Sequence, residues 1–322
     1  MMIRLNVRLI GILALVVLLG GCKRGSLIAW ERQSTGIMAN LSSLSFTDER
    51  NGWVVGEKGT ILRTKDGGRT WVQQKSGIQS NLFSVNFIDA ITGWAVGEDM
   101  TLMETADGGL TWNARNKTSM GFSHESGPNT LLSVDFVDKQ YGFMVGTFGE
   151  VLATNDGALN WNPLELGSNF YHTSIQFMDT QKGWVTSMRG DILYTEDGGR
   201  TWTAQVHLIK SLNGIHFVDT EFGWAVGNEG NILHTTDGGK RWLNQRSPTR
   251  ADLFGVFFTD RQEGWAVGMG GTILYTTNSG ESWKPEKSVT TQDLWAIQFV
   301  GKSHGWIVGQ GGVVLHFSKN KT

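Results

Sequence analysis

The sequence contains one cysteine and four prolines among its 322 residues. A single cysteine excludes an internal disulfide and a cysteine-based zinc site. The seven histidines show no ligand spacing either, so neither a metal site nor a cofactor is expected. A formal net charge of −2 argues against general nucleic-acid binding. No low-complexity run divides the chain, which is therefore expected to form one domain.

The only long apolar run lies at the N-terminus, and it is too short to span a membrane as a mature helix. Arg4 and Arg8 precede the apolar stretch Leu9 to Leu19, which ends in Leu19-Gly20-Gly21-Cys22. This pattern resembles a bacterial lipoprotein signal. It predicts a signal peptide over residues 1–21, a lipidated Cys22 and a tether over 22–27. The alternative is an ordinary secretory signal with an incidental cysteine.

A lipidated cysteine would hold the protein at a membrane surface without spanning it. The predicted location is extracytoplasmic, on the periplasmic side of the cell envelope or on the thylakoid lumen side in a cyanobacterium. Removing the signal takes away Arg4 and Arg8 and no acidic residue, so the net charge of −2 becomes −4.

Thirteen of the fourteen tryptophans occupy two positions of a repeat of about 41 residues. One series follows a glycine, at Trp53, Trp94, Trp184, Trp224, Trp265 and Trp306, and Gly142-Phe143 fills the gap. The other series is Trp30, Trp71, Trp112, Trp161, Trp202, Trp242 and Trp283. This repeat length is typical of a four-stranded propeller blade.

Each repeat contains four short strand patterns separated by glycine or aspartate, as in Leu82 to Trp112. The seventh repeat stops at Leu315-His316-Phe317 without a fourth strand, and Trp30 precedes the first repeat at the spacing of a fourth strand. We therefore predict an all-β, seven-bladed propeller over residues 28–322. Its ring closes when the segment Ile28 to Gln33 completes the last blade.

The turn between the third and fourth strands has the pattern Thr-x-Asp-Gly-Gly-x-x-Trp, which resembles the Asp-box of sialidases and other glycoside hydrolases. Aspartate in such a turn accepts bonds from nearby backbone N–H groups, and glycine permits positive φ. A structural role is predicted for one residue in each of six turns: Asp66, Asp107, Asp156, Asp197, Asp237 and Asn278.

A glycoside hydrolase needs two carboxylates about 5 to 9.5 Å apart in one pocket. Acids that recur once per blade cannot meet in this way, so no catalytic residue and no enzyme activity are predicted. A sialidase-like glycan-binding or hydrolytic protein remains the less favoured alternative.

One connection between blades departs from the repeat. Trp112 and Leu131 are separated by 19 positions rather than 11, which adds eight residues within Asn116 to Asn129. This loop should share a face with the turns between second and third strands. Aromatic and arginine side chains gather in the same sector and are predicted to bind a partner: Phe122, His124, Phe148, Phe170, Tyr171 and Arg189. The alternative is that Phe148 and Phe170 fold inward. Trp295, which lies outside the repeat positions, is predicted to be a packing residue.

The repeated motifs Leu-x-x-Val-x-Phe-x-Asp, Gly-Trp-x-Val-Gly and Ile-Leu-x-Thr-x-Asp-Gly-Gly-x-Thr-Trp resemble those of the photosystem II stability and assembly factor family of plants and cyanobacteria. Leu82 to Trp112, Leu212 to Trp242 and Leu253 to Trp283 carry them best. The resemblance implies a non-catalytic, seven-bladed lipoprotein that binds early reaction-centre intermediates. A protein partner in a membrane complex is therefore expected. A propeller lipoprotein that serves a non-photosynthetic envelope complex is the alternative.

Overall fold

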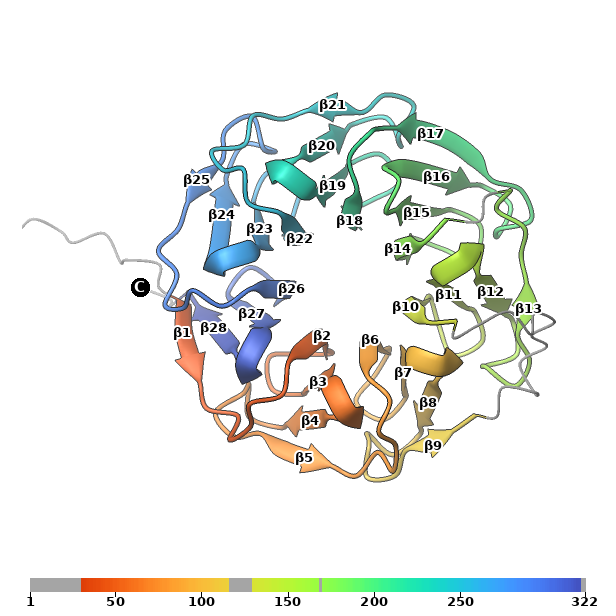
Figure 1. Ribbon diagram of the computed structural model, residues 1–322, viewed down its shortest axis with the longest axis vertical. Coiled ribbons are helices and arrows are strands. Elements are labelled where there is room, and N and C mark those ends of the chain that lie inside the picture. Colours follow the sequence, from red (N-terminus) through yellow and green to blue (C-terminus); the bar gives the residue numbers. More distant parts are fainter. Residues whose placement is uncertain (1–29, 116–128, 168–169, 320–322) are drawn as a thin grey trace, which may run out of the picture.

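The computed structural model describes residues 30–115, 129–167 and 170–319. Seven four-stranded antiparallel sheets surround a central opening (Figure 1). The predicted fold is confirmed. The seven inner strands, one from each blade, are β2 (Leu41–Phe46), β6 (Leu82–Phe87), β10 (Leu131–Phe136), β14 (His172–Phe177), β18 (Leu212–Phe217), β22 (Leu253–Phe258) and β26 (Leu294–Val300).

The second strands are β3 (Gly52–Gly56), β7 (Gly93–Gly97), β11 (Gly142–Gly146), β15 (Gly183–Ser187), β19 (Gly223–Gly227), β23 (Gly264–Gly268) and β27 (His304–Gly309). The third strands are β4 (Ile61–Thr64), β8 (Leu102–Thr105), β12 (Val151–Thr154), β16 (Asp191–Thr195), β20 (Ile232–Thr235), β24 (Thr272–Thr276) and β28 (Val314–Ser318). The outer strands are β5 (Val72–Gln74), β9 (Asn113–Ala114), β13 (Asn162–Pro163), β17 (Thr203–His207), β21 (Leu243–Asn244), β25 (Lys284–Pro285) and β1 (Trp30–Gln33).

The ring is closed by the N-terminal strand, as the sequence predicts. β1 pairs antiparallel with β28, and Trp30 lies opposite Phe317. Trp30 is 1 % exposed, and its indole N–H donates to the carboxylate of Glu286 at 2.9 Å. Chain ends that are distant in sequence therefore share one blade, and the outer edge of the third strand is covered.

The Gly-Trp pairs form the contacts between blades. Gly52 lies opposite Phe46 in the β2–β3 register, and a Cβ at Gly52 would overlap the Phe46 ring. Glycine therefore makes room for that ring. Trp53 in turn stacks on Phe87 of the next blade, with ring centroids 3.7 Å apart. The equivalent stacks, at 3.4 to 4.1 Å, complete the circle: Trp94–Phe136, Phe143–Phe177, Trp184–Phe217, Trp224–Phe258, Trp265–Phe299 and Trp306–Phe46.

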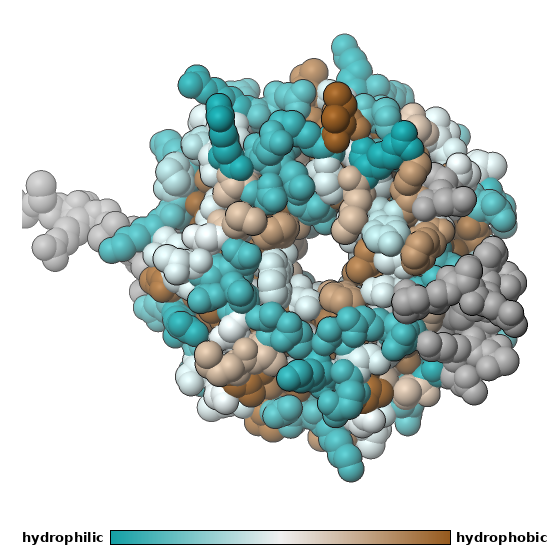
Figure 2. Space-filling view, in the orientation of Figure 1, coloured by the Kyte–Doolittle hydropathy of each residue, from teal (hydrophilic) through white to brown (hydrophobic). Residues whose placement is uncertain are grey.

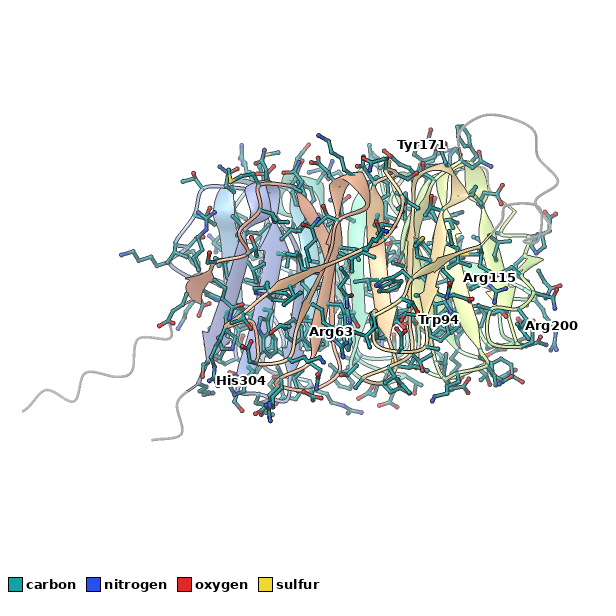
Figure 3. All side chains as sticks on the ribbon, turned by 90° about the horizontal axis from the view of Figure 1, so that it is seen from below. Arg63, Trp94, Arg115, Tyr171, Arg200 and His304 are labelled. Atoms are coloured by element: carbon teal, nitrogen blue, oxygen red, sulfur yellow. The ribbon has the colours of Figure 1, made fainter. Side chains whose placement is uncertain are left out.

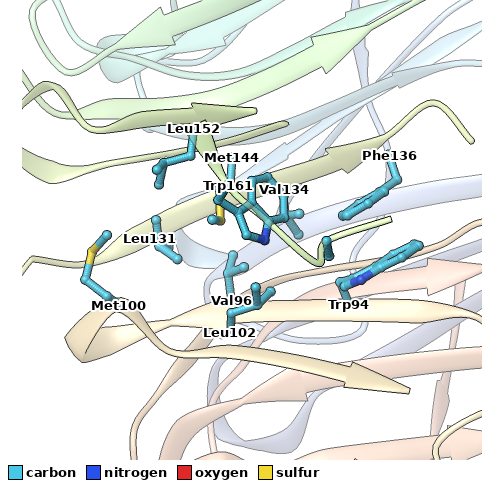
Figure 4. Packing of buried hydrophobic residues seen from close by; sticks show 11 residues of the cluster. Trp94, Val96, Met100, Leu102, Leu131, Val134, Phe136, Met144, Leu152 and Trp161 are labelled. Atoms are coloured by element: carbon cyan, nitrogen blue, oxygen red, sulfur yellow. The ribbon is translucent and has the colours of Figure 1, made fainter. Parts of the chain in front are cut away.

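The second tryptophan series packs edge-on against the same phenylalanines. Figure 4 shows one such set, in which Phe136 lies between Trp94 of the preceding blade and Trp161 of its own blade. The Phe136 and Trp161 ring centroids are 5.8 Å apart at 90°. Large aromatic pairs contribute both buried area and a preferred geometry, so the tryptophan repeat directly sets the spacing of the blades.

The ring has two different faces. One face carries the connections between blades and the six short 3₁₀ turns between second and third strands, η1 (Glu57–Gly59), η2 (Glu98–Met100), η4 (Thr147–Gly149), η5 (Asn228–Gly230), η6 (Met269–Gly271) and η7 (Gln310–Gly312). We call it the loop face. The opposite face, which we call the Asp-turn face, carries six turns between third and fourth strands, five with an aspartate and one with Asn278 at the same position. Tyr171 and His304 mark the two faces in Figure 3. Within the described ranges, no helix is long and apolar enough to cross a membrane.

Candidate partner-binding surface

Four of the six predicted partner-binding residues lie together on the loop face. Phe148 projects from η4 and is 50 % exposed, and its ring centroid is 5.2 Å from that of Tyr171. The guanidinium of Arg189 lies over the Phe170 ring, 4.3 Å from its centroid. Phe170 and Tyr171 are also exposed. These four side chains, which we call the aromatic cluster, face solvent rather than folding inward.

Backbone hydrogen bonds join the three loops that carry the cluster. The Gly149 N–H donates to the Phe170 carbonyl at 2.9 Å, and the Met188 N–H donates to the Tyr171 carbonyl at 2.9 Å. Phe148 itself adopts a positive φ of 57°, which is uncommon for a bulky residue. The cluster is therefore held by the same bonds that connect blades three and four. The other two predicted residues, Phe122 and His124, lie outside the described ranges.

Blade four departs from the repeat at the turn that carries Arg189. The second strand ends in glycine in the other six blades, where a Cβ would overlap a carbonyl of the preceding connection, as at Gly56 against Asn40. Blade four has Ser187 instead. The Ser187 hydroxyl donates to the Asp191 carboxylate at 2.9 Å and accepts from the Arg189 N–H at 3.2 Å. A serine-centred turn thus replaces the 3₁₀ turn and exposes Met188 and Arg189.

The central opening forms a cavity of about 620 Å³ on the loop face. Its wall includes the second residue of each inner strand: Ser42, Phe83, Leu132, Thr173, Asn213, Phe254 and Trp295. Met188 also lines the cavity, and its backbone N–H bonds to the carbonyl of Tyr171 in the aromatic cluster, so the cavity and the cluster are neighbours. Figure 2 shows this face hollowed at its centre, with apolar side chains along the rim.

The structure adds to the sequence interpretation of Trp295 as a packing residue. Trp295 is partly buried, and it also lines the cavity together with Phe83 and Phe254. The three aromatic residues share one position of the inner strand, which was the available signal. Period-2 alternation shows that they lie on one side of the strand, but it does not show that this side faces the opening.

A circle of contacts between neighbouring inner strands lies deeper in the opening. The side chain at the fifth position of an inner strand reaches the next blade, as when the Asn86 amide oxygen accepts from the Phe136 N–H at 3.3 Å. Ser45, Asp135, Gln176 and Gln298 accept from a backbone N–H of the next blade in the same way. In blade five the His216 Nε2 bonds instead to the Phe258 carbonyl at 3.1 Å, and in blade six Phe257 contacts Phe299.

Two members of this circle have strongly shifted pKa values. Loss of hydration raises the pKa of the Asp135 carboxyl to about 6, although that carboxylate accepts a bond from the Phe177 N–H at 2.7 Å. Loss of hydration lowers the pKa of the His216 imidazole to about 4. Both shifts disfavour the charged form, because the groups lie partly buried between blades without an ion-pair partner.

The six predicted turn residues lie on the opposite face, one per blade, and each is bonded within its own turn. Asp66 accepts from the Thr64 hydroxyl, from the Thr70 N–H at 2.9 Å and from the Thr70 hydroxyl at 2.6 Å. Asp107, Asp156, Asp197, Asp237 and Asn278 make equivalent contacts. The side-chain and backbone bonds from Thr111 lower the pKa of Asp107 to about 2. The carboxylates therefore do not meet in one pocket.

Comparison of the sequence with known protein families identifies a family for this chain. The sequence profile described as "Photosynthesis system II assembly factor YCF48" matches residues 23–79, 71–127, 123–214 and 243–318. The chain belongs to this family. The family resemblance predicted from the motifs is therefore confirmed. A comparison with curated proteins finds no match.

Two solved structures of YCF48 proteins share the fold of this YCF48-family chain. One, described as YCF48 bound to D1 peptide, has 23 % identity and a TM-score of 0.76, covering 90 % of this chain and 95 % of its own. The other, YCF48 from Cyanidioschyzon merolae, has 22 % identity and a TM-score of 0.76, covering 91 % and 100 %.

An inactive variant of virginiamycin B lyase from Staphylococcus aureus also matches, with 12 % identity, a TM-score of 0.73 and coverage of 91 % and 99 %. A likeness at that identity shows the propeller fold alone, because propellers carry many unrelated functions. Among the described residues, no group of three or more histidine, cysteine, aspartate or glutamate side chains is arranged to hold a metal ion.

Proposed function

We propose that this YCF48-family protein is a non-catalytic propeller that binds a protein partner through its loop face and assists the assembly or stabilisation of a membrane complex. The observation that carries the proposal is the aromatic cluster. Exposed aromatic side chains beside an arginine are typical of binding hot spots, and here they sit on a rigid ring. The Asp-turn carboxylates, in contrast, are engaged in holding their own turns.

The partner that we propose is a photosystem II reaction-centre intermediate. The support comes from the family and from the related structure described as YCF48 bound to D1 peptide. A non-photosynthetic envelope complex is the second candidate, and the genes that neighbour this one would separate the two. A set of photosystem genes beside it favours the first.

The location that we propose is extracytoplasmic, with the propeller anchored through lipid on Cys22. The motif Leu19-Gly20-Gly21-Cys22 supports this proposal. Acyl chains contribute about 0.8 kcal/mol for each buried methylene, so a multiply acylated cysteine would hold the domain at the membrane. We expect Cys22→Ser to move the protein from the membrane fraction to the soluble envelope fraction. Detergent-dependent extraction of the variant would contradict the lipid anchor.

Tyr171→Ala and Arg189→Ala test the site itself. Loss of a central aromatic or arginine contact typically costs 2 kcal/mol or more, which is a roughly thirtyfold loss of affinity. We expect both variants to recover much less partner in pull-downs of the tagged protein from its native membranes. Arg200→Ala is the matched control, because Arg200 belongs to the same blade but lies on the opposite face (Figure 3).

Thermal melts of the three variants establish that each is folded. If Tyr171→Ala and Arg189→Ala melt like the parent and recover as much partner as it does, the aromatic cluster is not the binding site. A loss of partner in Arg200→Ala alone would assign binding to the Asp-turn face instead.

A further inference from the structure

The cavity wall has two apolar sides separated by polar residues. Phe83 and Leu132 come from the neighbouring blades two and three, and Phe254 and Trp295 come from blades six and seven. Ser42 of blade one separates them on one side, and Thr173 and Asn213 of blades four and five separate them on the other. A ligand at the centre of the opening would therefore contact aromatic or aliphatic side chains on two sides.

Two polar residues of the wall, Thr173 and Asn213, are already bonded to the protein. The Thr173 hydroxyl donates to the Leu212 carbonyl at 2.7 Å. The Asn213 amide donates to the Leu253 carbonyl and to the Asn228 side chain, both at 2.9 Å. Because these groups are satisfied across the blade boundaries, they do not require a polar ligand. The chemistry that the cavity offers is mainly apolar contact.

The acidic residue at the cavity rim is engaged in the same way. Both carboxylate oxygens of Glu57 accept bonds from Asn40, at 2.6 Å from the amide and 3.3 Å from the backbone N–H. On the adjacent blade, Asn81 donates to Glu98 at 2.9 Å. These fixed pairs reduce the tendency of the rim to attract a cation.

Arg189 differs from these groups. Its guanidinium is held over the Phe170 ring, and none of the ion pairs among the described residues includes it. The nearby Asp191 carboxylate is bonded to Ser187 and to His207. Arginine presents a planar fork of donors that suits a carboxylate. The charge at this point of the loop face is therefore available to a carboxylate from another molecule.

Met188 connects the two features. It lines the cavity and directly precedes Arg189 in the chain. An extended peptide advances about 3.3 to 3.6 Å per residue, so a peptide that enters the cavity beside Met188 can place a neighbouring side chain at the adjacent Arg189. A cavity of about 620 Å³ has the size of a pocket for a small ligand or a few side chains.

We propose that the central cavity binds a bulky apolar side chain of an extended peptide segment, and that Arg189 binds a carboxylate of the same segment one to three residues away. This proposal rests on the proposed function, because it specifies which part of a protein partner the loop face recognises. The carboxylate is a side chain of aspartate or glutamate or a free C-terminus. Both provide the same group to Arg189.

Selection from a displayed library of random decapeptides on the full chain tests this proposal. We expect the recovered peptides to combine a phenylalanine, tryptophan or leucine with an acidic residue or a free C-terminus at that spacing. Affinities of a recovered peptide, its Phe→Ala form and its Glu→Gln form are then measured by isothermal titration calorimetry. Amidation of the C-terminus distinguishes the two sources of the carboxylate.

Two cavity variants use residues that the repeat already accepts. Trp295→Ser and Phe83→Ser place at this strand position the serine that blade one carries at Ser42. We expect each to weaken peptide affinity by at least about tenfold, because an aromatic side chain of the cavity wall that would contact the peptide's apolar side chain is lost. Arg189→Gln should remove the preference for the acidic peptide over its Glu→Gln form. The matched controls, Leu110→Ser and Arg200→Gln, occupy one position of the turns on the opposite face and should change neither.

Unchanged peptide affinity in folded Trp295→Ser and Phe83→Ser would overturn the cavity assignment. Recovery of peptides without an acid, or an unaltered acid preference in Arg189→Gln, would overturn the role of Arg189. If the library gives no peptides but 1-anilinonaphthalene-8-sulfonate binds and is lost in Trp295→Ser, the cavity takes a small apolar molecule and the peptide proposal is wrong. The two proposals can fail separately. If the cavity and Arg189 variants change peptide binding as expected while Tyr171→Ala leaves partner recovery in the membrane pull-down unchanged, the aromatic cluster is not the partner-binding site but the cavity proposal stands.

Discussion

Asp135 gives a prediction whose magnitude depends on pH. Its carboxyl has a pKa of about 6 in the folded protein against an ordinary value of 3.8. Between about pH 4 and pH 6 the folded state therefore holds a proton that the unfolded chain has lost, and stability falls as the pH rises through this window. A shift of about two units corresponds to about 3 kcal/mol. Because the side chain is only partly enclosed, solvent screening reduces the effect, and we expect about 1 to 2 kcal/mol.

Asp135→Asn removes the ionisation but keeps an oxygen that accepts from the Phe177 N–H, as Asn86 does for Phe136 in the preceding blade. Urea unfolding followed by tryptophan fluorescence should show the variant to be more stable than the parent at pH 7.5 and equal to it near pH 4. Asn86→Asp is the reciprocal control and should destabilise the protein above pH 6. A difference between Asp135→Asn and the parent that stays constant from pH 4 to pH 7.5 would refute this reasoning.

Two further changes test the closure of the ring and the turns. Trp30→Ala removes a buried side chain that packs against Phe299 and Phe317, and it should lower the free energy of unfolding by about 3 to 5 kcal/mol. The control Glu31→Ala changes an exposed residue of the same strand and should have little effect. Similar melting of both variants would show that β1 is not needed for closure. Asp237→Ala removes the bond from the Arg241 N–H and should lower the free energy of unfolding by about 1 to 2 kcal/mol without loss of partner binding. Lys240→Ala, which changes an exposed residue of the same turn, is the control. Loss of partner binding in an Asp237→Ala protein that melts normally would instead make the turns part of a binding site.

The sequence predicted the fold in detail because each blade is specified by local chemistry. Gly-Trp pairs, turn aspartates and strand alternation recur at one spacing, and the missing fourth strand of the last repeat identified Trp30 as its replacement. The sequence did not show why glycine precedes each tryptophan. That reason is three-dimensional, since Gly52 makes room for the Phe46 ring of its own blade while Trp53 stacks on Phe87 of the next.

The candidate site was predicted less completely. Phe148, Phe170, Tyr171 and Arg189 were identified from unusual side chains in the connections, and they do lie together. The contribution of the inner strands was missed, because residues such as Phe83 and Phe254 look like ordinary alternating strand residues. Only the closed ring brings side chains from seven separate blades around one cavity, and their sequence separation of about 40 residues gives no local signal.

Blade four shows which kind of departure from a repeat carries functional information. A longer connection requires little rearrangement of the ring, because surface loops accept insertions at small cost. The exchange of glycine for Ser187 is different, since a Cβ at this point of the other blades would overlap the backbone of the preceding connection. The chain must rebuild the turn to accept it, and it does so with bonds from the Ser187 hydroxyl. The rebuilt turn places Met188 at the cavity and Arg189 on Phe170, so a sterically restricted position of the repeat is also where the two parts of the proposed binding surface meet.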